Sequence, residues 1–176
     1  VFNNYYDRVI DAKMTRTQKR ALVSGDIHPT HALYFGTVLG LCGAGILFFF
    51  TTPVALYVGL LGWVIYVALY TPLKHTSGHA LWVGALAGAT PPVAGYAAVT
   101  NTLDLQAFWL FLFMFLWQVP HFMGIALYRF DEYHNAGVPL ILKKSPSAKN
   151  KRRGRSIFYL SLVVLLLWCG ALMLHR

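Results

Sequence analysis

Two acidic groups lie beside apolar stretches of this 176-residue sequence, and their oxygen atoms suit a divalent cation. In the first group, Asn3, Asp7 and Asp11 are spaced four residues apart. On a helix with 3.6 residues per turn, this spacing places an amide and two carboxylates on one stripe. Mg²⁺ prefers such ligands and completes its shell with water or phosphate oxygens. The alternative is a solvated helix end, on which the acids pair with Arg8 and Lys13.

The second acidic group, Asp131 and Glu132, follows the apolar stretch 105–127. Charged residues beside membrane-spanning stretches often mark functional sites. Binding of a second metal ion, or of the other end of a diphosphate, is one interpretation of this pair. A hydrated loop end is the other.

Basic residues flank both acidic groups and could hold phosphate oxygens. Arginine does so through a two-pronged fork, and lysine acts as a point charge. Lys74 and Arg129 are the strongest candidates, because each stands at the very end of an apolar stretch. For most of the others, orientation in the membrane or contact with lipid head groups is the alternative. The flanking set is Arg8, Lys13, Arg16, Lys19, Arg20, Lys74 and Arg129.

One histidine, His121, lies inside an apolar stretch and directly follows Pro120. An ionisable side chain at membrane depth indicates a function, and two roles stay open here. The ring could bond the carbonyl that Pro120 leaves free, or it could contact a polar or metal-bearing substrate. Interfacial solvation is the interpretation for the histidines in loops and at span ends. These are His28, His31, His75, His79, His134 and His175.

The elements that position these residues are predicted to be membrane-spanning helices. The sequence is 57% hydrophobic and only 12% charged, and a soluble domain carries roughly twice that charged fraction. Five apolar segments are long enough to cross a bilayer, and backbone groups in lipid must bond within their own segment. We therefore predict an all-α polytopic transmembrane bundle, with residues 1–176 as a single domain. The spans are 31–50, 54–71, 80–99, 105–127 and 156–174.

The charge distribution predicts that both acidic groups share one membrane face. Of the 15 Lys and Arg residues, all but Arg176 fall in 1–30, 72–79 and 128–155. This asymmetry places those segments toward the cytoplasm or its equivalent, and it explains the net charge of +9 better than nucleic-acid binding does. Four predicted spans separate the acidic groups, and an even number returns the chain to the same side. The two cysteines form no CxxC pattern, which argues against a disulfide framework or a zinc knuckle.

Four stretches of the sequence resemble the UbiA superfamily of intramembrane prenyltransferases, and within it the branch that farnesylates haem. They are Asn3–Arg20, Tyr70–Lys74, Gly84–Val99 and Leu116–Pro139. The first stretch marks the superfamily, whereas Pro-His-Phe at 120–122 and Ala-Gly-Val-Pro at 136–139 favour the haem branch. The sequence departs from the family pattern at Ala21, at Glu132 and after Pro139, and these departures bear on the geometry of the second acidic group.

The resemblance implies a bundle of about nine helices, of which about five would be present here as a fragment. It implies that farnesyl diphosphate binds through Mg²⁺ and that haem B is the acceptor, with haem A synthase as a possible downstream partner. The implied catalytic residues are Asp7, Asp11 and Glu132. The implied metal ligands are Asn3, Asp7, Asp11, Asp131 and Glu132. The implied substrate-binding residues are Asn3, Arg8, Arg16, Arg20, Lys74, His121, Arg129 and Tyr133.

The same resemblance implies a bacterial inner membrane or a mitochondrial inner membrane as the location. Three other functions stay open from the sequence. A different superfamily member would prenylate a quinone precursor. A cation-coupled transporter would place its acids near the membrane midplane. A membrane anchor without activity would not need Asp7 and Asp11.

Overall fold

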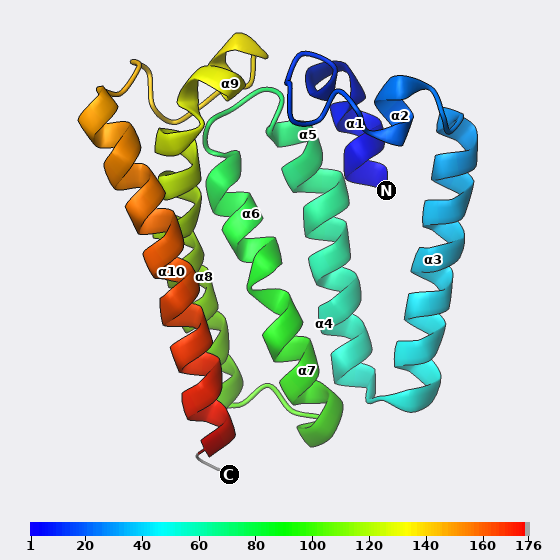
Figure 1. Ribbon diagram of the computed structural model, residues 1–176. Coiled ribbons are helices and arrows are strands. Elements are labelled where there is room, and N and C mark those ends of the chain that lie inside the picture. Colours follow the sequence, from blue (N-terminus) through cyan, green and yellow to red (C-terminus); the bar gives the residue numbers. More distant parts are fainter. Residues whose placement is uncertain (175–176) are drawn as a thin grey trace.

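The computed structural model describes residues 1–174, and His175 and Arg176 lie outside the described residues. The described part consists of helices and connecting loops, which confirms the all-α prediction (Figure 1). The elements are α1 (Phe2–Asp11), α2 (Ala21–Ser24), α3 (Pro29–Phe50), α4 (Pro53–Val64), the π-helical η1 (Ile65–Tyr70), α5 (Thr71–Leu73), α6 (Ala80–Gly88), α7 (Thr90–Thr100), α8 (Leu105–Tyr128), α9 (Phe130–Asn135) and α10 (Ala148–Leu174).

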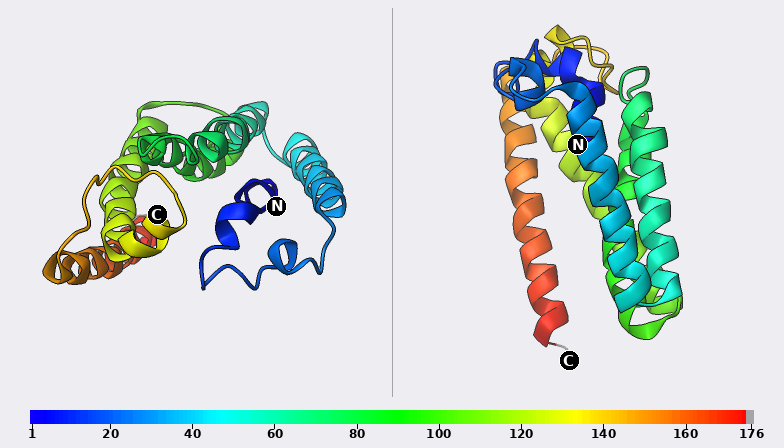
Figure 2. Two further views of the ribbon diagram at one scale, coloured as in Figure 1. Left: turned by 90° about the horizontal axis from the view of Figure 1, so that it is seen from above. Right: turned by 90° about the vertical axis from the view of Figure 1, so that its right-hand side faces the viewer.

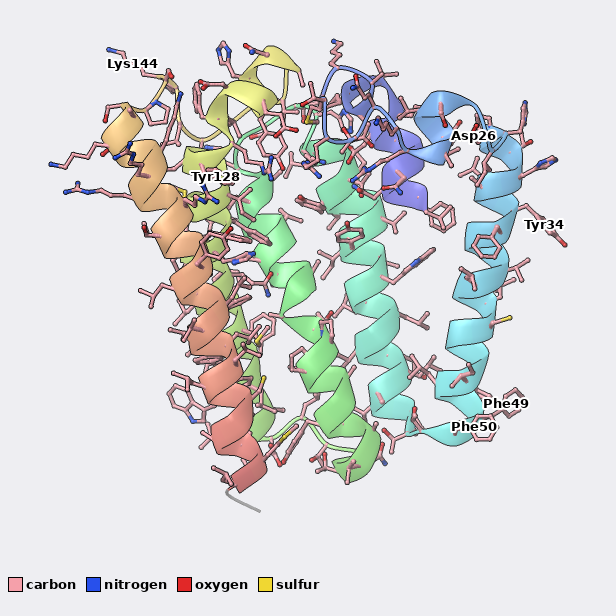
Figure 3. The ribbon with its side chains drawn as sticks, in the orientation of Figure 1. Asp26, Tyr34, Phe49, Phe50, Tyr128 and Lys144 are labelled. Atoms are coloured by element: carbon pink, nitrogen blue, oxygen red, sulfur yellow. The ribbon has the colours of Figure 1, made fainter. Side chains whose placement is uncertain are left out.

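Four helices of the described chain are long and apolar enough to cross a membrane: Pro29–Phe50, Pro53–Leu73, Leu105–Tyr128 and Ala148–Leu174. The second of these joins α4, η1 and α5 into one continuous helix. Large apolar side chains stand on their outer surfaces, including Phe49 and Phe50 (Figure 3). Such a surface is unfavourable in water and favourable in lipid.

The predicted span over 80–99 consists of two consecutive helices, α6 and α7, which meet at Ala89. The cause is proline. Pro91 has no N–H to donate to the Ala87 carbonyl, and the Thr90 hydroxyl donates to that oxygen instead, at 2.8 Å. The two shorter helices still follow one another between α4 and α8 from one end of the bundle to the other (Figure 1).

The long helices lie along an open arc, and α1 lies on its concave side (Figure 2). The short helices α1, α2, α5 and α9 gather at one end of the bundle, which we call the charged end (Figure 1). Because α1 carries the first acidic group and α9 the second, both groups are at the same end. This confirms the prediction from span parity and charge.

Helices α8 and α10 pack closely at Gly154, which predicts an effect of added volume there. A methyl group on Gly154 would lie 2.5 Å from Leu127 Cβ, whereas one on Gly170 of the same helix would meet nothing within 4 Å. We expect Gly154→Ala to destabilise the protein by about 1–3 kcal/mol, because the helices must move apart. Unfolding in mixed detergent micelles measures this, with Gly170→Ala as the control. Equal stability of the two variants would contradict the described packing.

Candidate active site

The first acidic group lies on α1 and is buried at the charged end. Asp7 is 2% exposed and Asp11 is 3% exposed. Helix α1 covers Phe2–Asp11, so Asn3, Asp7 and Asp11 form the stripe that the spacing predicts. The alternative of a solvated helix end is wrong, because both carboxylates are buried. Buried carboxylates need close partners to offset their lost hydration, and here those partners come from outside α1.

Asp7 is held by two residues that follow α5. Its Oδ2 atom is 2.6 Å from Lys74 Nζ, and its Oδ1 atom is 2.9 Å from His75 Nε2. Lys74 is a predicted site residue, whereas His75 is a histidine that interfacial solvation does not explain, because it contacts Asp7. The available signal for His75 was its position directly after Lys74 at the end of a span.

Asp11 is held by the loop that follows α1 and folds back over it. Arg20 NH1 lies 2.5 Å from Asp11 Oδ2, and it also donates to Asn4 Oδ1 at 3.2 Å. The Thr17 hydroxyl, which is fully buried, donates to the Asp11 carbonyl at 2.9 Å. Arg20, a predicted substrate-binding residue, thus pairs with an acid of the α1 stripe. Asn4 and Thr17 are site residues that sequence reasoning missed, because their roles depend on how the loop folds.

Glu132 on α9 is paired with Arg16 of the loop that follows α1. Arg129 NH1 is 2.9 Å from Glu132 Oε2, and Arg16 Nε is 3.5 Å from Glu132 Oε1. Arg16 belongs to the same loop as Arg20. The ion pair to Arg16 thus joins segments that are more than a hundred residues apart in the sequence.

Asp131, the neighbour of Glu132, is oriented differently. Its side chain is 60% exposed, and Oδ2 lies 2.5 Å from Lys151 Nζ on α10. The hydrogen bond from Lys151 holds the pKa of the Asp131 carboxyl below its usual value. Ser145 also lies within 3.4 Å of this carboxylate. The structure therefore does not bring Asp131 together with the acids of α1.

An apolar cluster joins the segments that carry the two acidic groups. Ile10 and Met14, from the first segment, pack with Ala136 and Val138, and Tyr133 covers this cluster. The Ala-Gly-Val-Pro element thereby holds α9 against α1. Tyr133 is a predicted substrate-binding residue, and the structure places it at this junction.

Two buried polar atoms of the site have no hydrogen-bond partner among residues 1–174: Asn3 Nδ2 and Glu132 Oε1. The second is at ion-pair distance from Arg16 but forms no hydrogen bond with it. Buried unsatisfied atoms are rare, and here one is a donor and the other an acceptor. A donor suits a phosphate oxygen, and a carboxylate oxygen suits a hard cation such as Mg²⁺.

No cluster of three or more His, Cys, Asp or Glu side chains with metal-binding geometry is present within residues 1–174. The five predicted metal ligands therefore do not form one site made of protein groups alone. Mg²⁺ commonly takes only one or two protein carboxylates and keeps oxygen ligands from phosphate and water. The donor set fits such a shared cation.

One cleft lies beside the charged end, and a second, larger cleft lies deeper among the apolar helices. The upper cleft has a volume of about 250 Å³, and its lining includes Tyr70, Lys74, Tyr133 and Phe122. The deep cleft has a volume of about 640 Å³ and is lined mainly by small and apolar residues, with Phe122 again and Gln118. Phe122 is common to both linings. A ligand with a charged head and an apolar tail matches this gradient.

Arg8 and His121, two predicted substrate-binding residues, have local partners. Arg8 stacks over the Tyr5 ring at 4.3 Å and donates to the Tyr5 carbonyl at 2.7 Å. It is not paired with the acids of α1. His121 Nδ1 lies 2.9 Å from Ser161 Oγ on α10, so its bond is to this hydroxyl and not to the carbonyl that Pro120 frees.

Comparison with known proteins identifies the family. The sequence pattern of the UbiA prenyltransferase family matches residues 1–176. This chain belongs to the UbiA prenyltransferase family. With its four helices of membrane-spanning length, it is an integral membrane protein, and the resemblance seen in the four sequence stretches is confirmed.

Two relatives of the UbiA family show how far the similarity extends. The protoheme IX farnesyltransferase of Acinetobacter baylyi is 47% identical over 142 residues, which are 80% of this chain and 49% of the relative. The protein of the same name from Francisella tularensis subsp. novicida is 42% identical over 164 residues, 93% of this chain and 57% of the relative. The chain spans about half the length of these relatives. No solved structure matches the chain significantly.

Proposed function

We propose that the protein transfers a farnesyl group from farnesyl diphosphate to a vinyl group of haem B and so makes haem O. The names of the relatives support the acceptor. The observation that carries the proposal is that the buried acids of α1 and the partly buried Glu132 of α9 lie at one end of the bundle, where Arg16 from the loop after α1 pairs with Glu132, beside a cleft that Lys74 and Tyr133 line. Acids at one end of the bundle also disfavour a transporter, which would place them near the midplane.

In this proposal the chain holds the diphosphate between its two acidic groups. Asp7, Asp11 and Glu132 would hold Mg²⁺, with Asn3 donating to a phosphate oxygen. When bound, Mg²⁺ neutralises charge that builds up on the departing diphosphate. The basic residues that pair with these carboxylates would then turn to phosphate oxygens. They are Arg16, Arg20, Lys74 and Arg129.

The apolar clefts would protect the reaction from water. The bond between C1 of the farnesyl group and oxygen breaks, and both electrons leave with the diphosphate. The π electrons of the vinyl group then form the new carbon–carbon bond. One water molecule adds to the resulting cation and loses a proton, which gives the hydroxyl group of haem O. Tyr70, Phe122 and Tyr133 surround the start of this path, and aromatic faces stabilise cations.

The proposed location is a bacterial inner membrane or a mitochondrial inner membrane, with the charged end toward the cytoplasm or matrix. The excess of Lys and Arg at this end supports that orientation. Haem O released there would be available to a haem A synthase, which is the proposed downstream partner.

A pigment assay tests the proposed function. Membranes that contain the full protein are incubated with haem B and farnesyl diphosphate, with and without Mg²⁺, and the pigments are separated and weighed by mass spectrometry. We expect haem O only when farnesyl diphosphate and Mg²⁺ are both present. Prenylation of an aromatic quinone precursor, with haem B left unchanged, would refute the haem assignment and favour another UbiA activity.

A further inference from the structure

A hydrogen-bond chain between α8 and α10 fixes the position of the proton on the His121 ring. Ser161 Oγ lies 2.6 Å from the Phe158 carbonyl oxygen and 2.9 Å from His121 Nδ1. A carbonyl oxygen only accepts, so the hydroxyl proton of Ser161 is donated to Phe158. The hydroxyl oxygen must then accept from His121, which places the ring proton on Nδ1. Ser161 is itself 6% exposed, so water does not compete for these bonds.

The other ring nitrogen, Nε2, consequently carries a free lone pair. No hydrogen bond to Nε2 is formed by any residue within 1–174. The ring plane is held by stacking on Trp117, at 5.0 Å between centroids and 21° between planes, and by Phe158 at 5.0 Å. A rigid neutral imidazole with one anchored N–H and one bare nitrogen is the arrangement found in histidine ligands to metals.

His121 lies on α8 between the side that packs on α10 and the side whose residues line the two clefts. Gln118, His121, Phe122 and Ile125 are related by i, i+3, i+4 and i+7, which places them on one face of the helix. The three neighbours of His121 in this set line the upper or the deep cleft. His121 therefore lies at the edge of the same space, on the side of α10. It is about 6 Å along the helix axis from Ile125, which lines the upper cleft.

We propose that His121 Nε2 coordinates the iron of the porphyrin acceptor and that Ser161 is the positioning residue that keeps this nitrogen free of a proton. This inference rests on the proposed function, since it takes haem B as the acceptor. Imidazole nitrogen is a common ligand of iron. Coordination there would hold the porphyrin against α8, whose next turn lines the upper cleft at Ile125. It also orients the porphyrin before the diphosphate leaves.

Haem binding without farnesyl diphosphate tests the inference by a readout other than activity. The full protein in lipid nanodiscs is titrated with haem B, and optical and electron paramagnetic resonance spectra are recorded. We expect a histidine-ligated spectrum that His121→Gln loses, because glutamine keeps a donor for Ser161 but is a poor iron ligand. In His121→Ala, added imidazole should restore the spectrum.

Ser161→Ala should weaken haem affinity by about 10–100-fold, as expected for loss of the partner that orients a metal-ligating histidine. Ser156→Ala on the same helix is the matched control, because Ser156 is exposed and bonds only the Arg152 carbonyl. This control should bind haem like the unchanged protein.

The outcomes separate this inference from the proposed function. If the protein makes haem O but His121→Gln keeps the unchanged spectrum, the iron ligand is elsewhere and only the inference is overturned. Equal haem affinity of Ser161→Ala and Ser156→Ala would remove the role of Ser161. Absence of haem O, together with prenylation of a different acceptor, would refute the proposed function and the inference with it.

Discussion

Replacing Asp7 by Asn is expected to lower haem O formation by about 10²–10³-fold, the range seen when one group that stabilises a transition state is removed. Asparagine has nearly the same shape, but it leaves Lys74 without its buried negative partner, so the variant should be less stable and its rate is counted per folded protein. The change removes a negative ligand from the buried stripe of α1, where the carboxylate now meets Lys74 and His75. Haem O formed per minute in membranes, normalised to protein, measures the effect.

Asp26→Asn is the matched control for this experiment. Asp26 is an acid of the same end of the bundle, but it is exposed and accepts a hydrogen bond from Ser24 at 2.6 Å. Its replacement should leave haem O formation unchanged. If Asp7→Asn behaves like Asp26→Asn, the buried stripe has no part in the reaction, and the protein fits a membrane anchor without activity better.

The second prediction with a large effect concerns Asp131 and Glu132, two adjacent acids of α9 whose replacement should affect haem O formation differently. Glu132→Gln should lower haem O formation by about 10²-fold, because Glu132 pairs with Arg16 of the loop after α1 and keeps a buried oxygen without a hydrogen-bond partner in the described residues. Asp131→Asn should have little effect, because Asp131 is exposed and pairs with Lys151 on α10. Initial rates at several farnesyl diphosphate concentrations would show whether Glu132 acts on binding or on turnover.

The neighbouring variant serves as the control, since both changes remove one charge from the same short helix. Equal losses in both variants would mean that α9 rotates when substrate binds. A loss only in Asp131→Asn would contradict the described orientation of α9.

Ion pairs with basic side chains explain how the acids of α1 can be buried. Like charges four residues apart on α1 repel, and the sequence suggested a cation between them. The structure shows that Lys74 and Arg20 neutralise Asp7 and Asp11 individually. The two carboxylates are buried and need a close opposite charge, so these basic residues also stabilise the fold. Under the proposed function, substrate binding would exchange these basic partners between the carboxylates and the phosphate oxygens.

The stripe of α1 and the shared end of the acidic groups could be predicted from the sequence. Helical spacing fixes the direction of Asn3, Asp7 and Asp11, and the parity of the spans fixes the end. Which of Asp131 and Glu132 faces the site could not be predicted, because neighbours on a helix point about 100° apart and the rotation of α9 depends on its packing. The partnership of His75 with Asp7 likewise depends on tertiary packing.

The break between α6 and α7 was readable in principle. Two consecutive prolines at 91 and 92 remove two backbone N–H donors. The carbonyl oxygens that these donors would have bonded then need other partners, because lipid offers none. The apolar character of the segment outweighed this signal in the sequence. The local compensation by the Thr90 hydroxyl is a detail that only the structure gives.

The central claim is that the two acidic groups share one divalent cation. Binding of Mn²⁺ in place of Mg²⁺ tests it most directly, because bound Mn²⁺ is detected by electron paramagnetic resonance. The full protein is given Mn²⁺ with an unreactive thio analogue of farnesyl diphosphate. We expect bound Mn²⁺ only with the analogue, and strongly weakened binding in both Asp7→Asn and Glu132→Gln but not in Asp26→Asn. Unchanged Mn²⁺ binding in either of the first two variants would contradict a cation shared by the two acidic groups.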